Sequence, residues 1–313
     1  MIKIDLITGF LGSGKTTFIQ KYAQYLINQG YKIGIIENDF GAVNVDMLLL
    51  QNALDDQCDL EMISGGCDQQ THQRRLKTKL ISMGMMNYDR IIMEPSGIFD
   101  MDEFFDILYE EPLNKWYEIG NVIAIVNARL EDTLSSKAEY LLASQIAYAG
   151  SIILSQSQNA TEIEIQNTIN HLSSSLKEVK CHRMIKQDIL SFHWDDLAQE
   201  QWKRIMQCGY VLESFVKKHF SFDQAFTSLY LFHIHMDQRK LYETIQKIMN
   251  DQTCGDILRI KGFLSIDQDQ WIELNATRQN IMIQSTQVGQ EVIIVIGENL
   301  HEEIIQRYFK NHS

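Results

Sequence analysis

The sequence predicts an α/β protein with a mostly parallel sheet, followed by a smaller C-terminal α+β domain. Two observations lead to this prediction. The first half of the chain alternates short apolar runs, rich in β-branched residues, with helical patterns, as expected of a parallel sheet covered on both faces. After residue 227 the pattern changes to several strands and two helices, which is typical of a small α+β domain with an antiparallel sheet.

The elements follow from the periodicity of apolar residues. In the first half we expect strands at residues 2–8, 32–37, 90–94, 122–127 and 151–154, and helices at residues 15–29 and 158–177. In the second half we expect strands at residues 228–235, 257–265, 271–276, 280–286 and 291–296, and helices at residues 238–249 and 300–310. Residues 187–222 lack a clean period, so the domain boundary is placed there. The predicted organisation is a first domain at 1–195, a connecting region at 196–224 and a second domain at 225–313.

The composition indicates a folded protein that does not bind nucleic acid. Hydrophobic residues make up 45% and charged residues 22% of the 313 positions, which are globular values. With 28 basic and 41 acidic residues the formal charge is −13, which opposes binding to a polyanion.

The chain is also expected to be cytoplasmic, with no membrane partner. Lys3 and Asp5 interrupt the apolar start that a signal peptide would need, and no run approaches the ~18 apolar residues of a membrane span. The five cysteines are odd in number and scattered, which favours reduced thiols over a disulfide framework.

A phosphate-binding motif joins the first predicted strand to the first predicted helix. Residues 9–16, GFLGSGKT, match GxxxxGK[ST] in the strand-to-helix context that this motif requires. Its glycines let successive N–H groups face the phosphates, the lysine reaches the β/γ oxygens, and the threonine hydroxyl binds Mg²⁺. The first domain is therefore predicted to be a P-loop NTPase domain. The residues expected to bind the nucleotide here are Gly9, Gly12, Ser13, Gly14, Lys15, Thr16 and Thr17.

A second carboxylate site is expected at Glu94. This residue ends the apolar run 91–93 and is followed closely by Gly97. The carboxyl end of a strand in a parallel sheet is where a further Mg²⁺ ligand and a sensor of the γ-phosphate belong. We therefore expect Thr16 and Glu94 to hold Mg²⁺, and Gly97 to lie near the γ-phosphate.

These motifs, together with residues 37–46 (ENDFGAVNVD), 63–67 (ISGGC) and 94–97 (EPSG), resemble the CobW-like metallochaperone GTPases. Residues 256–264 (DILRIKGFL) and 294–297 also resemble the C-terminal domain of that family, so the resemblance covers nearly the whole chain. It implies GTP as substrate, Mg²⁺ as cofactor, a divalent metal such as Zn²⁺ or Co²⁺ as cargo, and a client metalloenzyme as partner.

The metal motif of the family, G-G-C-x-C-C, departs from its pattern here. Two of the three thiolates are replaced, because residues 67–70 read CDQQ. A transition-metal site of the zinc type usually has about four ligands. The remaining candidate ligands here are Asp39, Cys67 and His72. The alternative interpretation is that Cys67 is a single buried structural cysteine.

The guanine-reading motif N-K-x-D is also changed. Residues 155–158 after the strand at 151–154 read SQSQ, so Ser155, Gln156 and Gln158 would meet the base. The aspartate of the motif accepts two hydrogen bonds from guanine, whereas a glutamine offers one carbonyl beside a repelling NH₂ group. Losing such polar recognition costs a few kcal/mol, so GTP and other nucleoside triphosphates both stay open as substrates.

Two further clusters have a functional and a plain interpretation. His233 and His235 lie two apart in a predicted strand, a spacing that suits a metal but is also common on half-exposed strands. The basic residues Arg74, Arg75, Lys77 and Lys79 would face a nucleotide or an acidic partner, or form a solvated helix face.

The predicted function is slow hydrolysis of a nucleoside triphosphate, with Lys15, Thr16 and Glu94 as the catalytic set. Asp39, Asp46 and Gly97 would lie on segments that order around the γ-phosphate and relax after hydrolysis. One interpretation is a metallochaperone that inserts metal into a client. A second is a nucleotide-dependent switch that binds a protein partner without metal cargo. A third, phosphate transfer to a small molecule, would need an acceptor pocket with a base, for which the sequence supplies no clear candidate.

Overall fold

The computed structural model describes residues 1–39, 50, 58–64, 69–95, 101–194, 197–216, 226–267, 270–286 and 289–310. It describes the backbone alone at residues 38, 39, 64, 69, 70, 72, 102, 103, 267 and 310. The described residues belong to two compact units, one before residue 217 and one after residue 225.

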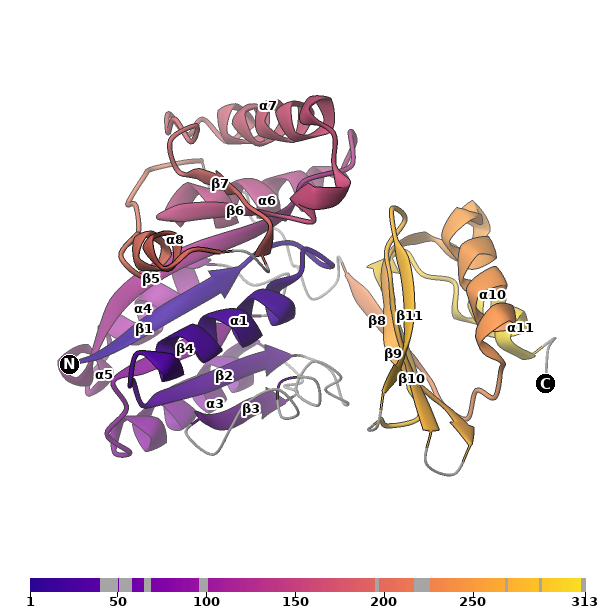
Figure 1. Cartoon of the computed structure of the whole chain (residues 1–313), viewed down its shortest axis with the longest axis horizontal. Helices are drawn as coiled ribbons and strands as arrows, with labels where there is room; N and C mark the ends of the chain where they lie inside the picture. The colour runs from indigo at the N-terminus through magenta and orange to yellow at the C-terminus, as the bar shows by residue number, and fades with distance from the viewer. Residues whose placement is uncertain are drawn as a thin grey trace. The chain divides into compact units, whose positions relative to one another are not determined.

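The first unit is built around a parallel sheet (Figure 1). Among the described residues it has seven strands in the order β3-β2-β4-β1-β5-β6-β7, each parallel to its neighbours. The strands are β1 (Ile2–Thr8), β2 (Ile33–Asp39), β3 (Cys58–Ser64), β4 (Arg90–Glu94), β5 (Tyr117–Asn127), β6 (Ser151–Ser155) and β7 (Ile189–Ser191). The helices are α1 (Lys15–Asn28), α3 (Gln69–Gly84), α4 (Met101–Tyr109), α5 (Leu113–Trp116), α6 (Ser136–Tyr148), α7 (Glu162–Glu178) and α8 (Gln199–Met206), with a 3-10 turn at Ser157–Asn159.

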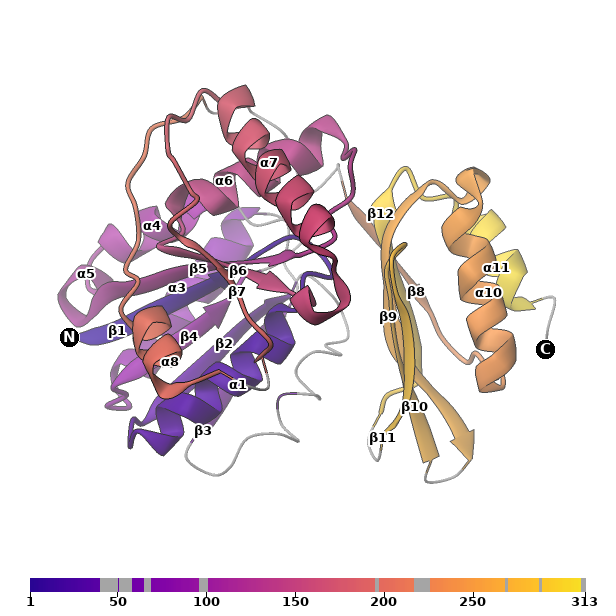
Figure 2. The same cartoon turned by 45° about the horizontal axis from the view of Figure 1, so that its top comes forward.

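Both faces of this sheet are covered by helices (Figure 2), which is why its central strands are apolar throughout. On one face, α1 and α8 pack on the sheet through a shared core. Trp202 of α8 stacks against Tyr25 of α1 with ring centroids 5.3 Å apart, and Phe18 of α1 lies in the same cluster. This core runs along α1 and holds the helix against the sheet. The N-terminus of α1 is therefore fixed in position next to the phosphate loop.

A buried polar network ties β1, β4 and β5 together within the first unit. Nη1 of Arg90 lies 2.7 and 2.6 Å from the two carboxylate oxygens of Asp5. The Tyr22 hydroxyl and the Asn121 backbone N–H donate to the same carboxylate, each at 2.8 Å. Since Asp5 is fully buried, its charge is stabilised by these contacts and not by water.

The second unit is an antiparallel sheet with both of its long helices on one face (Figure 1). Among the described residues the strand order is β11-β10-β9-β12-β8. The strands are β8 (Thr227–Leu231), β9 (Asp256–Asp267), β10 (Gln270–Ala276), β11 (Ile281–Thr286) and β12 (Val292–Glu298), and the helices are α10 (Gln238–Asn250) and α11 (Glu302–Lys310). Leu241 and Ile245 of α10 and Ile305 of α11 pack on alternate residues of the strands.

The predicted fold class is confirmed, with one strand placed too long. The strand expected at residues 228–235 ends at Leu231, because His233 adopts a left-handed backbone with φ of 57°. Residues 187–222, which had no clear period, contain β7 and α8. The predicted domain boundaries at 195 and 225 remain a prediction.

Two expectations from composition can be compared with the described residues. Cys58, Cys181, Cys208 and Cys254 are free thiols. No helix in the described ranges combines the length and the apolar character needed to cross a membrane.

Candidate nucleotide-binding site

The phosphate motif forms a tight loop between β1 and α1. Gly9, Gly12 and Gly14 have φ values of 145°, 74° and 95°, a region that residues with a side chain rarely adopt. At Gly9 a Cβ would also lie 2.3 Å from the Ile125 carbonyl oxygen. The backbone angle therefore favours glycine at all three positions, and at Gly9 the lack of space requires it as well.

The start of α1 presents its backbone N–H groups to this loop. Gly14 precedes the helix and has no side chain to cap it, and the first turn, from Lys15 to Phe18, carries no acidic residue. Helix N-termini left in this state attract anions, since the first N–H groups have no partners within the helix. Ser13 Oγ is buried and makes no hydrogen bond to the described residues. A phosphate is the group that suits these donors.

Lys15 folds back over the loop. Its Nζ donates to the Gly9 carbonyl at 2.9 Å and to the Phe10 carbonyl at 3.4 Å, and lies 3.9 Å from Oε1 of Glu94. The side chains of Lys15 and Glu94 are 5% and 8% exposed. The contact with Glu94 therefore places the buried positive charge of Lys15 between the loop and the end of β4.

Two buried carboxylates lie at the carboxyl ends of neighbouring strands. Glu94 ends β4, and its register partner on β2 is Glu37. The residues Glu37 and Glu94 are 3% and 6% exposed, and Thr16 is 8% exposed. A hydroxyl and a carboxylate are oxygen ligands that Mg²⁺ accepts, so Thr16 and Glu94 fit that ion chemically. Glu37 ends an apolar run in the same way as Glu94, a signal that could have identified it.

The segment predicted to meet the base follows β6, close to the phosphate loop. Ser155 is buried and Gln158 is exposed, while Gln156 has a left-handed φ of 55°. A Cβ built on Gly14 would lie 3.7 Å from Cβ of Ser155 and 3.5 Å from Cη2 of Trp194. The fold therefore brings Ser155 and Trp194 to the loop.

Trp194, like Glu37, is a residue of this site that sequence reasoning missed. It follows β7, and the two loops are joined by Ser157, whose hydroxyl donates to the Phe192 carbonyl at 3.4 Å. The Trp194 Nε1 and Gln156 Oε1 atoms are buried and make no hydrogen bond to the described residues. The indole N–H is a donor and the amide oxygen an acceptor, so each is a polar group that a ligand would satisfy.

Several predicted site residues cannot be placed. Asp46, Cys67 and Gly97 lie outside the described residues, and Asp39 and His72 are described by backbone only. Of the described side chains, no group of three or more His, Cys, Asp or Glu is arranged to hold a metal ion.

The histidine pair and the basic cluster are surface features. His233 and His235 are 86% and 73% exposed and both face Glu291, with N to O distances of 3.8 and 3.3 Å. On α3, Lys79 pairs with Glu61 at 2.7 Å and Lys77 pairs with Glu110. These contacts favour the solvated helix face over a nucleotide contact for Lys77 and Lys79.

The chain matches two family models. The CobW/HypB/UreG nucleotide-binding domain matches residues 3–185, and the cobalamin synthesis protein CobW C-terminal domain matches residues 228–312. These matches agree with the P-loop nucleotide-binding domain and the C-terminal α+β domain predicted from the motifs.

Individual relatives match part of the chain. Zinc chaperone YjiA of Escherichia coli (strain K12) is 31% identical over 172 residues, which cover 52% of this chain and 52% of the relative. Zinc chaperone YeiR of the same organism is 29% identical over 162 residues, covering 51% and 48%. The chain thus matches only about half the length of these curated relatives. The crystal structure of Zn(II)-bound YjiA GTPase from E. coli aligns over 100% of this chain and 99% of that one, at 20% identity and a TM-score of 0.41.

The nucleotide-binding model matches more than half of the chain, and the matched range includes the phosphate loop described above. The protein therefore belongs to the CobW/HypB/UreG family.

Proposed function

We propose that this protein hydrolyses a nucleoside triphosphate, with GTP as the first candidate, and uses the cycle to deliver a divalent transition metal to a client metalloprotein. The observation that carries the nucleotide part is the phosphate loop, in which Lys15 Nζ lies between the Gly9 carbonyl and the Glu94 carboxylate. The metal part is supported by the family and by the two relatives named as zinc chaperones.

The proposed reaction is attack of water on the γ-phosphorus. The bond from that phosphorus to the bridging oxygen breaks, and inorganic phosphate and the nucleoside diphosphate leave. Lys15 would stabilise the charge that develops on the phosphate oxygens, and the N–H groups at the start of α1 would hold the phosphates in place. Thr16 and Glu94 would hold Mg²⁺, which when bound neutralises phosphate charge.

The base would be bound by the segment 155–158 together with Trp194. The indole lies beside Gly14 and Ser155, so it is placed to contact a base whose phosphates sit in the loop. Contact with an aromatic ring tolerates any base. This favours GTP binding with weak discrimination against other nucleoside triphosphates.

The metal would be carried as a substrate and bound through Cys67, with Asp39 and His72 as further ligands. Three of the described cysteines, Cys58, Cys208 and Cys254, are poor competitors for this role. Burial raises the pKa of the Cys58 and Cys208 thiols to about 12 and that of Cys254 to about 11. Since the thiolate is the form that binds metal, these three thiols stay protonated at neutral pH.

The second candidate is a nucleotide-dependent switch that binds a protein partner without metal cargo. The sequence feature that favours it is the replacement of C-x-C-C by residues 67–70, CDQQ, which removes two thiolates. The same phosphate loop would serve both functions, so only the metal separates them.

Zinc titration of the purified protein against a chromophoric chelator separates the two candidates. The metallochaperone proposal predicts one tightly bound Zn²⁺ per chain, lost in Cys67→Ala and kept in Cys58→Ala, a matched thiol control. Binding that is weak, or equal in wild type and Cys67→Ala, would reject metal cargo at this site and leave the switch. Phosphate release from GTP measured on the same samples shows whether the nucleotide site is intact.

A further inference from the structure

Two histidines and a glutamate meet at one end of the sheet in the second unit. β8 pairs antiparallel with β12, with Leu231 opposite Ile293, and continuing this register past the last pair sets His233 opposite Glu291. Nδ1 of His233 lies 3.8 Å from Oε2 of Glu291. The chain turns at His233, where φ is 57°, and Nδ1 of His235 lies 3.3 Å from Oε1 of the same carboxylate. Each oxygen of Glu291 therefore has one imidazole beside it.

These separations suit a shared metal ion better than a hydrogen bond. Where the chain makes a hydrogen bond of this kind, Nε2 of His171 approaches Oε1 of Glu139 to 2.6 Å. Ligand atoms about 2.1 Å from a tetrahedral metal ion stand about 3.4 Å from one another. The two N to O separations at Glu291, 3.3 and 3.8 Å, lie on either side of that spacing.

Glu291 has a carboxylate oxygen that lacks a partner. The Oε1 atom is buried and accepts no hydrogen bond from the described residues, although the side chain as a whole is 25% exposed. A buried carboxylate oxygen is costly to leave in this state. A cation held between Glu291 and the two imidazoles would remove that cost.

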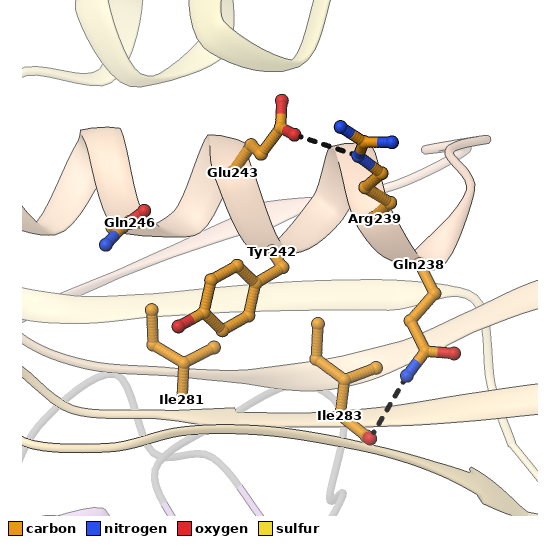
Figure 3. A pocket seen from close by; sticks show the side chains of 7 residues that line it. All are labelled: Gln238, Arg239, Tyr242, Glu243, Gln246, Ile281 and Ile283. Atoms are coloured by element: carbon orange, nitrogen blue, oxygen red, sulfur yellow. Dashed lines mark hydrogen bonds and ion pairs between the residues drawn. The ribbon is translucent and has the colours of Figure 1, made fainter.

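The pocket on the other side of the second unit lacks this chemistry. It measures about 660 Å³ and lies between α10 and β11 (Figure 3). Its charged lining residues, Arg239 and Glu243, pair with each other at 3.2 Å. None of the other residues that line it is a histidine, a cysteine or a carboxylate. The pocket therefore offers a metal ion neither an imidazole nor a carboxylate without a counter-charge.

Two imidazoles and one carboxylate form a ligand set that divalent transition metals accept. Zinc sites with three such protein ligands keep a fourth position open, whereas Mg²⁺ and Ca²⁺ prefer oxygen ligands throughout. His233 and His235 are 86% and 73% exposed, so an ion can enter from solvent and keep that position open. In the described ranges no set of side chains is already closed around a metal ion. The two exposed imidazoles would therefore rotate towards Glu291 as the ion binds.

We propose that His233, His235 and Glu291 form a second, exchangeable site for a divalent transition metal such as Zn²⁺. Nδ1 of each imidazole and the carboxylate of Glu291 coordinate the ion and displace water from it. The site is separate from the one proposed at Cys67 and does not depend on nucleotide hydrolysis. Because it has no thiolate and two of its ligands are exposed, it releases Zn²⁺ to a strong chelator that the Cys67 site resists.

Calorimetric titration of Zn²⁺ into Cys67→Ala protein isolates this site, because the thiolate of the other proposed site is absent. We expect one Zn²⁺ per chain, with affinity at least about tenfold weaker when His235→Gln or Glu291→Gln is added. Adding His182→Gln instead removes another exposed histidine and should leave the affinity unchanged. No binding by Cys67→Ala protein, or equal binding with His235→Gln and with His182→Gln, overturns the proposal.

Footprinting tests the same site in wild type, without depending on the folding of any variant. Diethyl pyrocarbonate modifies exposed imidazoles, and mass spectrometry measures the extent at each histidine. Zn²⁺ in excess over the Cys67 site should protect His233 and His235 and leave His182 unchanged. Equal protection of all three, or of none, contradicts the proposed site. That result together with Zn²⁺ binding that depends on Cys67 would reject this site and leave the proposed function standing.

Discussion

The ammonium group of Lys15 lies 3.9 Å from Oε1 of Glu94, and both side chains are more than nine-tenths buried. The first belongs to the start of α1 and the second to the end of β4. Two opposite charges buried at this depth stabilise each other, because each supplies the other with a nearby counter-charge. The pair therefore links the stability of the sheet edge to the chemistry proposed for the phosphate loop.

Glu94→Gln should lower hydrolysis and make stability depend more on nucleotide. We expect the phosphate release rate to fall by about 10²-fold, because a proposed Mg²⁺ ligand is lost from the reacting centre. A bound triphosphate would replace the missing negative charge beside Lys15, so the nucleotide-induced rise in Tm should be larger in the variant. Glu61→Gln, which alters a surface pair with Lys79, should change neither. An unaltered rate in Glu94→Gln would contradict the proposed role.

Gln158→Asp should restore preference for guanine. The carboxylate would accept two hydrogen bonds where the amide offers one, so affinity for a fluorescent GDP should rise by about tenfold while affinity for the matching ADP should not. The side chain of Gln158 is exposed, so the substitution should not affect folding. Titration of both nucleotides against the wild type and the variant gives the ratio of GDP to ADP affinity for each protein. An equal gain for both bases, or none, would show that residue 158 does not read the base.

Arg90→Met should be strongly destabilising. The Asp5 carboxylate is fully buried on the central strand β1 and takes two contacts from Arg90. The variant leaves this carboxylate without its cation, at a cost of about 3–5 kcal/mol. The double variant Asp5→Asn with Arg90→Met should lose less unfolding free energy than Arg90→Met alone, because the buried carboxylate is also removed. Lys115→Met removes an exposed pair with Glu111 and should cost about 1 kcal/mol or less. Urea unfolding measures all three, and similar losses for Arg90→Met and Lys115→Met would refute this account.

The contact between His171 and Glu139 should make stability depend on pH. Nε2 of His171 lies 2.6 Å from Oε1 of Glu139, and this hydrogen bond is the main cause that raises the pKa of His171 above its usual 6.5. Burial alone would raise the pKa of Glu139, but the hydrogen bonds from His171 and Ser175 outweigh burial and lower it below 4.5. The contribution of His171 to the free energy of unfolding is fully present below pH 6.5 and is lost as pH rises through its raised pKa. The glutamate contribution is present above pH 4.5 and is lost as pH falls through the lowered pKa.

The window of greatest stabilisation therefore lies between pH 4.5 and 6.5. His171→Gln keeps a hydrogen-bond donor and removes the titration. We expect wild type to exceed this variant by about 1 kcal/mol in unfolding free energy within the window and by less above it. Urea unfolding of both proteins within the window and well above it gives the comparison. A difference that is constant with pH would mean that the pair does not titrate as argued.

The phosphate loop was predictable because its requirements are local. Gly9, Gly12 and Gly14 need unusual backbone angles, and Lys15 follows at a fixed spacing, so eight consecutive residues specify the site. Glu94 could be predicted because a carboxylate directly after an apolar run lies at a strand end. Glu37 also follows an apolar run directly, so the same reasoning would place it at a strand end.

Trp194 could not be predicted in the same way. It reaches Gly14 only because β7 pairs with β6 at the far side of the sheet, and no short motif encodes that pairing. The strand at 228–235 was placed too long for a different reason. The alternation of apolar residues continues to His235, but the left-handed backbone at His233 ends the ladder at Leu231. Side-chain pattern alone does not report such a backbone angle.

In the proposed cycle, the nucleotide state of the protein controls its affinity for metal. A titration with Zn²⁺ in each nucleotide state measures this coupling. Zn²⁺ affinity should be measured by chelator competition with Mg²⁺ and either a non-hydrolysable GTP analogue or GDP bound. The account predicts affinities that differ by about tenfold or more between the two states, with the difference abolished in Cys67→Ala. Equal Zn²⁺ affinity in both states, with both nucleotides shown to be bound, would contradict it.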